Sequence, residues 1–187
     1  MSESQRSRTL FFVSRRPELG VGLIEPGSWS KEYDQYYAGR HQYGDPWMLI
    51  IEQAIEIERL TSHPDKPSRL RSSFACTTLE AAKSLTSRSM FGDSASLRLW
   101  ACELVKPDAP VHVGSFRLFE KLRTAISYRD AHEIARSYWS ASHPLSEQEL
   151  ITESPLRLTQ CLYIYHPGLG WQSAVTRAHE YPTPLGT

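Results

Sequence analysis

The stretch HPLSEQELITESPLRLTQCLYIYHP, residues 143–167, places two carboxylates, Glu147 and Glu149, just before a strand-like run. The run at residues 156–166 is apolar and rich in Tyr, which predicts a buried strand near the end of the fold. The two acids therefore occupy an exposed turn that leads into this strand. Acids in such a place either start a short helix and stay solvated, or form the acidic end of an active site.

The length and composition of the chain are those of an ordinary globular protein without a large net charge. The 187 residues suffice for one domain with a substantial core. Because 21 Lys and Arg balance 21 Asp and Glu, the formal net charge is zero, and no overall field points to nucleic acid or to a membrane. The polar N-terminus lacks the apolar core of a signal peptide, and no run reaches the ~18 apolar residues of a membrane helix. We expect a cytoplasmic protein, or one delivered into a host or target cell without a cleaved signal peptide.

The cysteines and histidines argue against a metal centre. Cys76, Cys102 and Cys161 stand singly among apolar residues, and their odd number without a Cys-x-x-Cys pair predicts buried thiols in a reducing compartment. The seven histidines lack the HxxxH and HExxH spacings of metal ligands. The sequence also lacks the GxSxG, P-loop and GxGxxG patterns.

Apolar periodicity predicts the secondary structure. Alternating or short apolar runs predict strands at residues 9–13, 72–77, 96–105, 111–116 and 156–166. A period near 3.6 predicts helices at residues 45–60, 78–88 and 128–141. Because strands and helices do not alternate as βαβ units, the order favours an α+β fold. We expect a flexible N-terminus at 1–8, a single domain at 9–170 and a tail at 171–187, with a long aromatic loop at 20–46.

Two of the predicted helices show a clear apolar face. In the first, Asp45 is placed to cap the helix and Pro46 suits its first position. The face we expect it to bury holds the apolar residues at positions 47, 50, 51, 54, 55 and 57. The corresponding face of the third helix holds Ala131, Ile134, Ala135 and Tyr138.

Five short motifs occur in an order that resembles the ADP-ribosyltransferase superfamily, in particular a bacterial family of unassigned function within it. The motifs are LFFVSRR (10–16), PSRLRSSFACTTLEAA (67–82), LWACELV (99–105), ARSYWSA (135–141) and EQELITESPLRLTQCLYI (147–164). They cover most of residues 9–166. The resemblance implies split antiparallel β-sheets with flanking helices, and a cleft that binds NAD as co-substrate. It also implies transfer of ADP-ribose to a macromolecule with release of nicotinamide, and a role as a bacterial effector or toxin fits it.

The resemblance assigns roles to Glu147 and Glu149, the two acids of the stretch at residues 143–167. Glu149 matches the family's catalytic carboxylate, and Glu147 matches the helper acid that contacts the acceptor side chain. Cleavage of NAD puts positive charge on the ribose, which a nearby carboxylate stabilises in the transition state. If the segment is extended, residues two apart point to the same side, so Glu147 would act as a base beside Glu149.

The resemblance and the chemistry of NAD together suggest a set of NAD-binding residues. Guanidinium groups suit the pyrophosphate and aromatic rings suit the nicotinamide. The set is Phe12, Val13, Ser14, Arg15, Arg69, Ser73, Phe74 and Tyr138. Phe12 stands where the family usually has a His. Arg15 then supplies the missing polar contact, or the pocket is rebuilt, or the activity is lost.

Two alternatives to a protein-modifying enzyme remain at this stage. The first is a catalytically degenerate binding module of the same fold, which holds a protein partner through the aromatic loop from Trp29 to Tyr43. The second is a transferase that modifies nucleic acid, for which the basic cluster from Arg69 to Arg71 is the relevant feature. A protein is the acceptor that we expect, without a membrane or a metal.

Overall fold

The computed structural model describes residues 9–27, 46–85, 96–118, 127–140 and 143–174 of the chain. Within these ranges the strands are β1 (Leu10–Ser14), β2 (Gly22–Ile24), β3 (Ser73–Cys76), β4 (Leu97–Leu104), β5 (Val111–Ser115), β6 (Gln148–Thr152), β7 (Leu156–His166) and β8 (Gly170–Ser173). The helices are α2 (Pro46–Ser62), α3 (Leu79–Ser84) and α5 (Tyr128–Ser140), with the 3₁₀ turns η1 (Arg69–Arg71) and η3 (Leu145–Glu147). The N-terminus at 1–8, the loop from Trp29 to Tyr43 and Asp45 lie outside the described residues.

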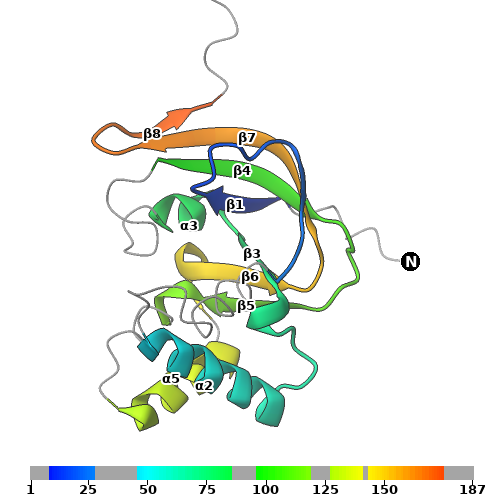
Figure 1. Cartoon of the computed structure of the whole chain (residues 1–187), viewed down its shortest axis with the longest axis vertical. Helices are drawn as coiled ribbons and strands as arrows, with labels where there is room; N and C mark the ends of the chain where they lie inside the picture. Colours follow the sequence, from blue (N-terminus) through cyan, green and yellow to red (C-terminus); the bar gives the residue numbers. More distant parts are fainter. Residues whose placement is uncertain (1–8, 28–45, 86–95, 119–126, 141–142, 175–187) are drawn as a thin grey trace, which may run out of the picture.

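The strands form one antiparallel sheet in the order β2-β7-β4-β1-β3-β6-β5, and β8 pairs with β7. Helices together with this sheet confirm the α+β class. β1 and β3 pair through one residue pair, Phe11 and Cys76, whereas β4 pairs with β7 along its whole length. Figure 1 shows β7, β4 and β1 in the upper part of the molecule and β3, β6 and β5 in the lower part.

All five predicted strands are present, but three others were not predicted. β2 lies in the segment that was predicted as a loop, and β8 follows the strand that was expected to be the last. β6 begins at Gln148, so the predicted turn holds for Glu147, which lies in η3, and is wrong for Glu149, which lies in the strand. β8 ends at Ser173 and so crosses the predicted boundary between domain and tail at residue 170.

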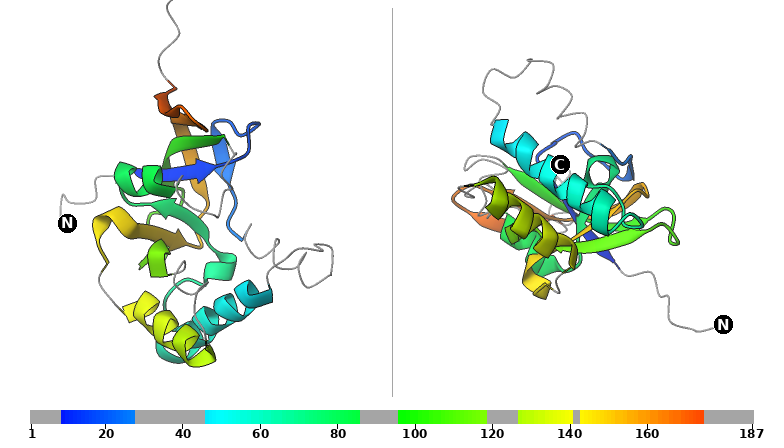
Figure 2. Two further views of the ribbon diagram at one scale, coloured as in Figure 1. Left: turned by 90° about the vertical axis from the view of Figure 1, so that its left-hand side faces the viewer. Right: turned by 90° about the horizontal axis from the view of Figure 1, so that it is seen from below.

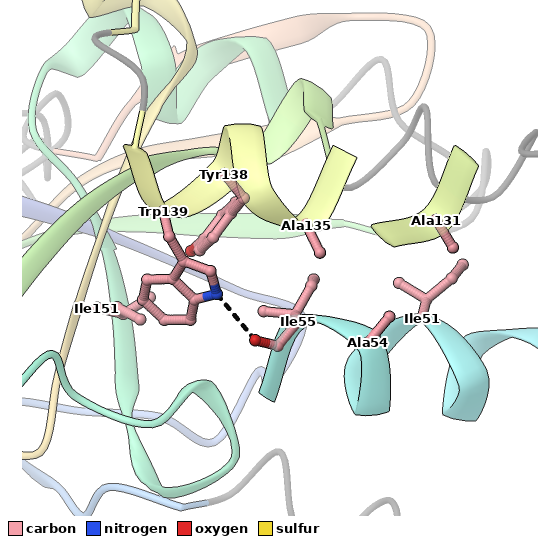
Figure 3. Packing of buried hydrophobic residues seen from close by; sticks show 8 residues of the cluster. All are labelled: Ile51, Ala54, Ile55, Ala131, Ala135, Tyr138, Trp139 and Ile151. Carbon is pink, nitrogen blue, oxygen red and sulfur yellow. Dashed lines mark hydrogen bonds between the residues drawn. The ribbon is translucent and has the colours of Figure 1, made fainter. Parts of the chain in front are cut away.

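Helices α2 and α5 pack side by side below β5 and β6, as Figure 1 and the left view of Figure 2 show. Their core contains Ile51, Ala54, Ile55, Ala131, Ala135, Tyr138, Trp139 and, from β6, Ile151. Figure 3 shows the indole of Trp139, whose Nε1 donates a hydrogen bond of 2.8 Å to the carbonyl oxygen of Ile55. The predicted inner face of α5 is therefore confirmed.

The predicted inner face of α2 is partly wrong. Ile57 is 44% exposed, and the carboxylate residue Glu58 is buried instead. At about 100° per residue, Ile57 lies about 120° around the helix from Ile51, whereas Glu58 lies about 20° from it. Position on the helix, and not side-chain polarity, therefore decides which residue of this turn is buried.

The two faces of β1 belong to two further cores. Phe12 packs against a cluster that includes Leu10 and Trp100, whereas Phe11 and Val13 pack against a cluster that includes the α3 residue Ala81. Helix α3 begins where predicted, because the Thr78 side chain accepts a hydrogen bond of 3.1 Å from the amide of Ala81.

The three cysteines are free thiols. Cys76 and Cys102 are buried, as predicted, and Cys161 is half-buried. Burial raises the pKa of the Cys102 thiol to about 12, so this thiol is not a nucleophile at neutral pH. No helix in the described part of the chain is long and apolar enough to cross a membrane.

Candidate active site

Glu149 is the second residue of β6, in the lower part of the sheet. It pairs with Cys76 of β3 on one side and with Gly114 of β5 on the other, so its backbone is held by two neighbouring strands. The side chain is 12% exposed. A carboxylate this poorly solvated needs charged or hydrogen-bonding partners. Glu149 is therefore an enclosed acid in a strand, and not a solvated charge at the start of a helix.

Arg69 is the main partner of Glu149. Its Nη1 donates to Oε1 of Glu149 and, at 2.7 Å, to the hydroxyl of Tyr138. The Nε atom lies 3.2 Å from Oε2 of Glu52 on α2. Burial alone would lower the pKa of Arg69, but the carboxylates of Glu149 and Glu52 outweigh it and raise the pKa well above its usual value. Arg69 is thus a fixed cation inside the protein, which two acids hold in place.

Tyr138 supplies the second hydrogen bond to Glu149. Its hydroxyl donates to Oε1 of Glu149 over 2.8 Å. Burial raises the pKa of the phenol well above its usual value, although Arg69 opposes this shift, so the group is a neutral donor. Both hydrogen bonds end on Oε1, and none of the described residues donates to the other oxygen, Oε2. The carboxylate is therefore oriented through one oxygen, and the second can accept a hydroxyl of a ligand.

Gly114 creates the space that Tyr138 occupies. A Cβ atom at this position would lie 2.4 Å from Cε2 and Cζ of the Tyr138 ring. No side chain larger than hydrogen fits between β5 and the ring without a shift of one of them. Gly114 is also the strand partner of Glu149. The Tyr138 ring, which packs over Gly114, therefore lies beside the Glu149 carboxylate.

Four of the predicted site residues come together around this carboxylate. The guanidinium carbon of Arg69 lies 4.9 Å from the centre of the Phe74 ring and 5.0 Å from the centre of the Tyr138 ring. Both distances are within the range of cation–π attraction. Phe74, Arg69, Tyr138 and Glu149 therefore form one cluster, which we call the Glu149 cluster.

Ser73 precedes Phe74 but faces the other side of the sheet. Successive side chains of a strand alternate between faces, and Phe74 pairs with Ile151, which belongs to the face of α2 and α5. Ser73 is buried, and its hydroxyl has no hydrogen-bond partner within the described residues. Sequence proximity to Phe74 thus does not bring Ser73 to Glu149.

The predicted residues at the end of β1 are dispersed. The side chains of Phe12 and Val13 point into different apolar clusters. Ser14 is buried, and its hydroxyl accepts a hydrogen bond of 3.1 Å from the amide of Arg16, whereas Arg15 is exposed. Contacts within the described part of the chain do not join these side chains to the Glu149 cluster.

Glu147 has partners of its own. It ends the 3₁₀ turn η3, so the alternation of an extended strand, which would place it beside Glu149, does not apply. The hydroxyl of Ser115 donates to its Oε2 at 3.3 Å, and Nε of Arg117 lies 3.1 Å from its Oε1. The intervening Gln148 accepts from Thr77 at 2.9 Å. Glu147 therefore belongs to a neighbouring polar group at the start of β6.

Glu52 is a site residue that is absent from the set predicted from the sequence. This acid lies next to Ile51 on the inner side of α2 and is 1% exposed. Acids are almost never fully buried unless they are paired, so an acid beside the apolar face of a helix is a signal for a buried cation elsewhere in the chain. That signal points to a buried cation, but it does not identify Arg69 as that cation.

The chain matches none of the protein-family models, and it matches none of the curated proteins either. The described residues also contain no group of three or more His, Cys, Asp or Glu that could hold a metal ion. The Glu149 cluster is therefore the feature that bears on function. That cluster can offer an oriented negative charge to an electron-poor group, and it can accept a hydrogen bond from a sugar hydroxyl.

Proposed function

We propose that this protein is an NAD-dependent ADP-ribosyltransferase that modifies a macromolecular acceptor, with a protein as the first acceptor to test. One observation carries the proposal. Arg69 and Tyr138 both bind Oε1 of Glu149, which orients the carboxylate and leaves Oε2 to accept a hydroxyl of the nicotinamide ribose. We also propose that the fold is of the ADP-ribosyltransferase type. The single residue pair that joins β1 to β3 supports a sheet that is split at this point.

The chemistry requires a negative charge at the ribose. The bond between the ribose C1′ and the nicotinamide nitrogen breaks, and its electron pair leaves with nicotinamide. Positive charge then spreads over C1′ and the ring oxygen until an acceptor atom forms a bond to C1′ and loses its proton. A preorganised carboxylate in a poorly solvated site stabilises this charge by about 3 kcal/mol, which is about a hundredfold in rate.

We assign Glu147 a different task in the same reaction. Its partner Arg117 is 57% exposed on its side chain, so the pair lies at the protein surface. An acid at the surface, near the start of the strand that carries Glu149, is suited to receive the proton of the acceptor. The NAD-binding roles of Phe12, Val13, Ser14, Arg15 and Ser73 remain predictions from the sequence.

The first experiment measures nicotinamide release and label transfer. The wild-type protein, Glu149→Gln and Glu103→Gln are incubated with NAD labelled in its ADP-ribose part and a cell lysate. Glu103 is a matched control, because it also lies in a strand, β4, and is ion-paired, with Arg157 at 3.0 Å. We expect Glu149→Gln to lose about a hundredfold in rate and Glu103→Gln to change it less than about twofold. An inactive wild type, or a Glu149→Gln variant with normal rate, would refute the proposal.

One observation favours a second function, a binding module of the same fold without turnover. Phe12 packs into the apolar cluster with Leu10 and Trp100, at the position where the resemblance implies a His. Calorimetry with NAD separates the two functions. Binding without release of nicotinamide supports the module, whereas binding with release supports the enzyme. Treatment of the lysate with nuclease before the labelling assay tests nucleic acid as the acceptor, since labelled nucleic acid is lost and labelled protein is kept.

A further inference from the structure

Arg69 divides its donors between two acids. Nη1 contacts Glu149, whereas Nε lies 3.2 Å from Oε2 of Glu52 and Nη2 lies 3.4 Å from Oε1 of Glu52. Glu52 is 1% exposed and Arg69 is 3% exposed, so water does not weaken this pairing. Glu52 therefore holds the arginine from the α2 side, while Nη1 donates to Glu149 and to the hydroxyl of Tyr138.

This division has an electrostatic consequence at the carboxylate. An arginine with one carboxylate neighbour forms a pair in which the two charges largely cancel. An arginine shared by two carboxylates still supplies hydrogen bonds to both, but the two acids divide its positive charge. Glu149 can thus be held by Arg69 and keep a negative charge that acts on a ligand at Oε2. Glu52 also fixes the plane of the guanidinium, and with it the position of Nη1.

We propose that Glu52 is a positioning residue for the reaction: it holds Arg69 so that Arg69 orients Glu149 without neutralising it. This inference rests on the proposed ADP-ribosyltransferase function. Glu52 touches neither substrate nor reacting atoms, and it acts through Arg69.

A positioning role and a purely structural role have different kinetic consequences. Loss of a structural contact lowers the amount of folded protein and leaves kcat and KM of the folded fraction unchanged. Loss of the charge on Glu52 lets Arg69 neutralise Glu149, which matters most when the ribose becomes positive in the transition state. We therefore expect kcat to fall and KM for NAD to change little. Residues that orient metal ligands from the outer shell contribute about 10- to 100-fold, and we expect an effect of similar size for Glu52.

The test compares Glu52→Gln with Glu58→Gln. Glu58 is a buried acid of the same helix, and its cationic partner is Arg136 at 3.9 Å rather than Arg69. Folded protein is quantified by circular dichroism, and nicotinamide release is measured over a range of NAD concentrations. We expect Glu52→Gln to reduce kcat about 10- to 100-fold with KM within about threefold of the wild type. Glu58→Gln is expected to keep kcat within about twofold.

The outcomes separate this inference from the proposed function. An inactive wild type overturns both. An active wild type with a Glu52→Gln variant of normal kcat overturns the inference alone, and so does a Glu52→Gln variant that changes KM and not kcat. Should Glu52→Gln fail to fold, Glu52→Asp decides the matter, because it keeps the charge and shortens the reach to Arg69. We expect it to lose at least about threefold in kcat, and a wild-type kcat would overturn the inference.

Discussion

Replacing Tyr138 by phenylalanine removes one oxygen atom from the Glu149 cluster and leaves the ring. The ring keeps its contacts with Trp139 at 5.0 Å and with His112 at 5.4 Å between centroids. The lost hydroxyl accepted from Arg69 and donated to Glu149. A hydrogen bond to a charged group contributes about 1.5–3 kcal/mol, but Arg69 and Glu149 keep each other and the phenol no longer needs to be desolvated. We therefore expect a loss of about 2 kcal/mol in the free energy of unfolding.

Urea unfolding followed by tryptophan fluorescence measures this loss. With a slope of about 2 kcal/mol per molar urea, the midpoint should fall by about 1 M. Tyr128→Phe is the control on the same helix, because Tyr128 is 52% exposed and should shift the midpoint very little. If Tyr138→Phe and Tyr128→Phe unfold at the same urea concentration, the two hydrogen bonds of the Tyr138 hydroxyl do not stabilise the fold, which would contradict this prediction.

Two further predictions concern the neighbours of Tyr138. Burial lowers the pKa of His112 from 6.5 to about 4, so the unfolded state takes up a proton at a higher pH than the folded state. The free energy of unfolding should therefore fall by about 3 kcal/mol as pH falls from 6.5 to 4. Urea titrations of the wild type and His112→Gln at about pH 7 and pH 4 test this, and equal losses in both proteins would contradict it. Gly114→Ala should lower the free energy of unfolding by at least about 1–3 kcal/mol in the same urea assay, because its Cβ meets the buried Tyr138 ring at 2.4 Å. The control is Gly20→Ala, whose Cβ meets nothing within 4 Å and which should unfold near the wild-type midpoint. A Gly114→Ala variant as stable as the wild type would show that the ring can move.

The main elements of the fold are readable from local patterns, and the missed strands lack such patterns. Strand β4 and helix α2 are long enough to show a clear apolar period. Strand β2 has three residues and begins at Gly22, whose φ of +155° is rare for other residues, so its sequence looks like a loop. The acids Glu147 and Glu149 favour an exposed turn, so the sequence does not reveal strand β6. The burial of Glu149 depends on Arg69, which lies 80 positions earlier in the chain.

The site was predictable to the extent that its chemistry is local. The resemblance points to Glu149, and the chemistry of their side chains points to Arg69, Phe74 and Tyr138; the fold brings these four together. The pairing of Glu52 with Arg69 depends on how α2 lies against η1, which no local pattern encodes. Strand pairing likewise places the segment at the end of β1 away from the Glu149 cluster.

The role of Glu149 is tested by a crystal structure of the protein with a carbocyclic NAD analogue, in which the scissile bond cannot break. The account predicts that Oε2 of Glu149 accepts a hydrogen bond from a hydroxyl of the ring that replaces the nicotinamide ribose. It also predicts that Oε1 keeps its contacts with Arg69 and Tyr138. An analogue bound elsewhere, or bound without any contact to Glu149, would contradict the account.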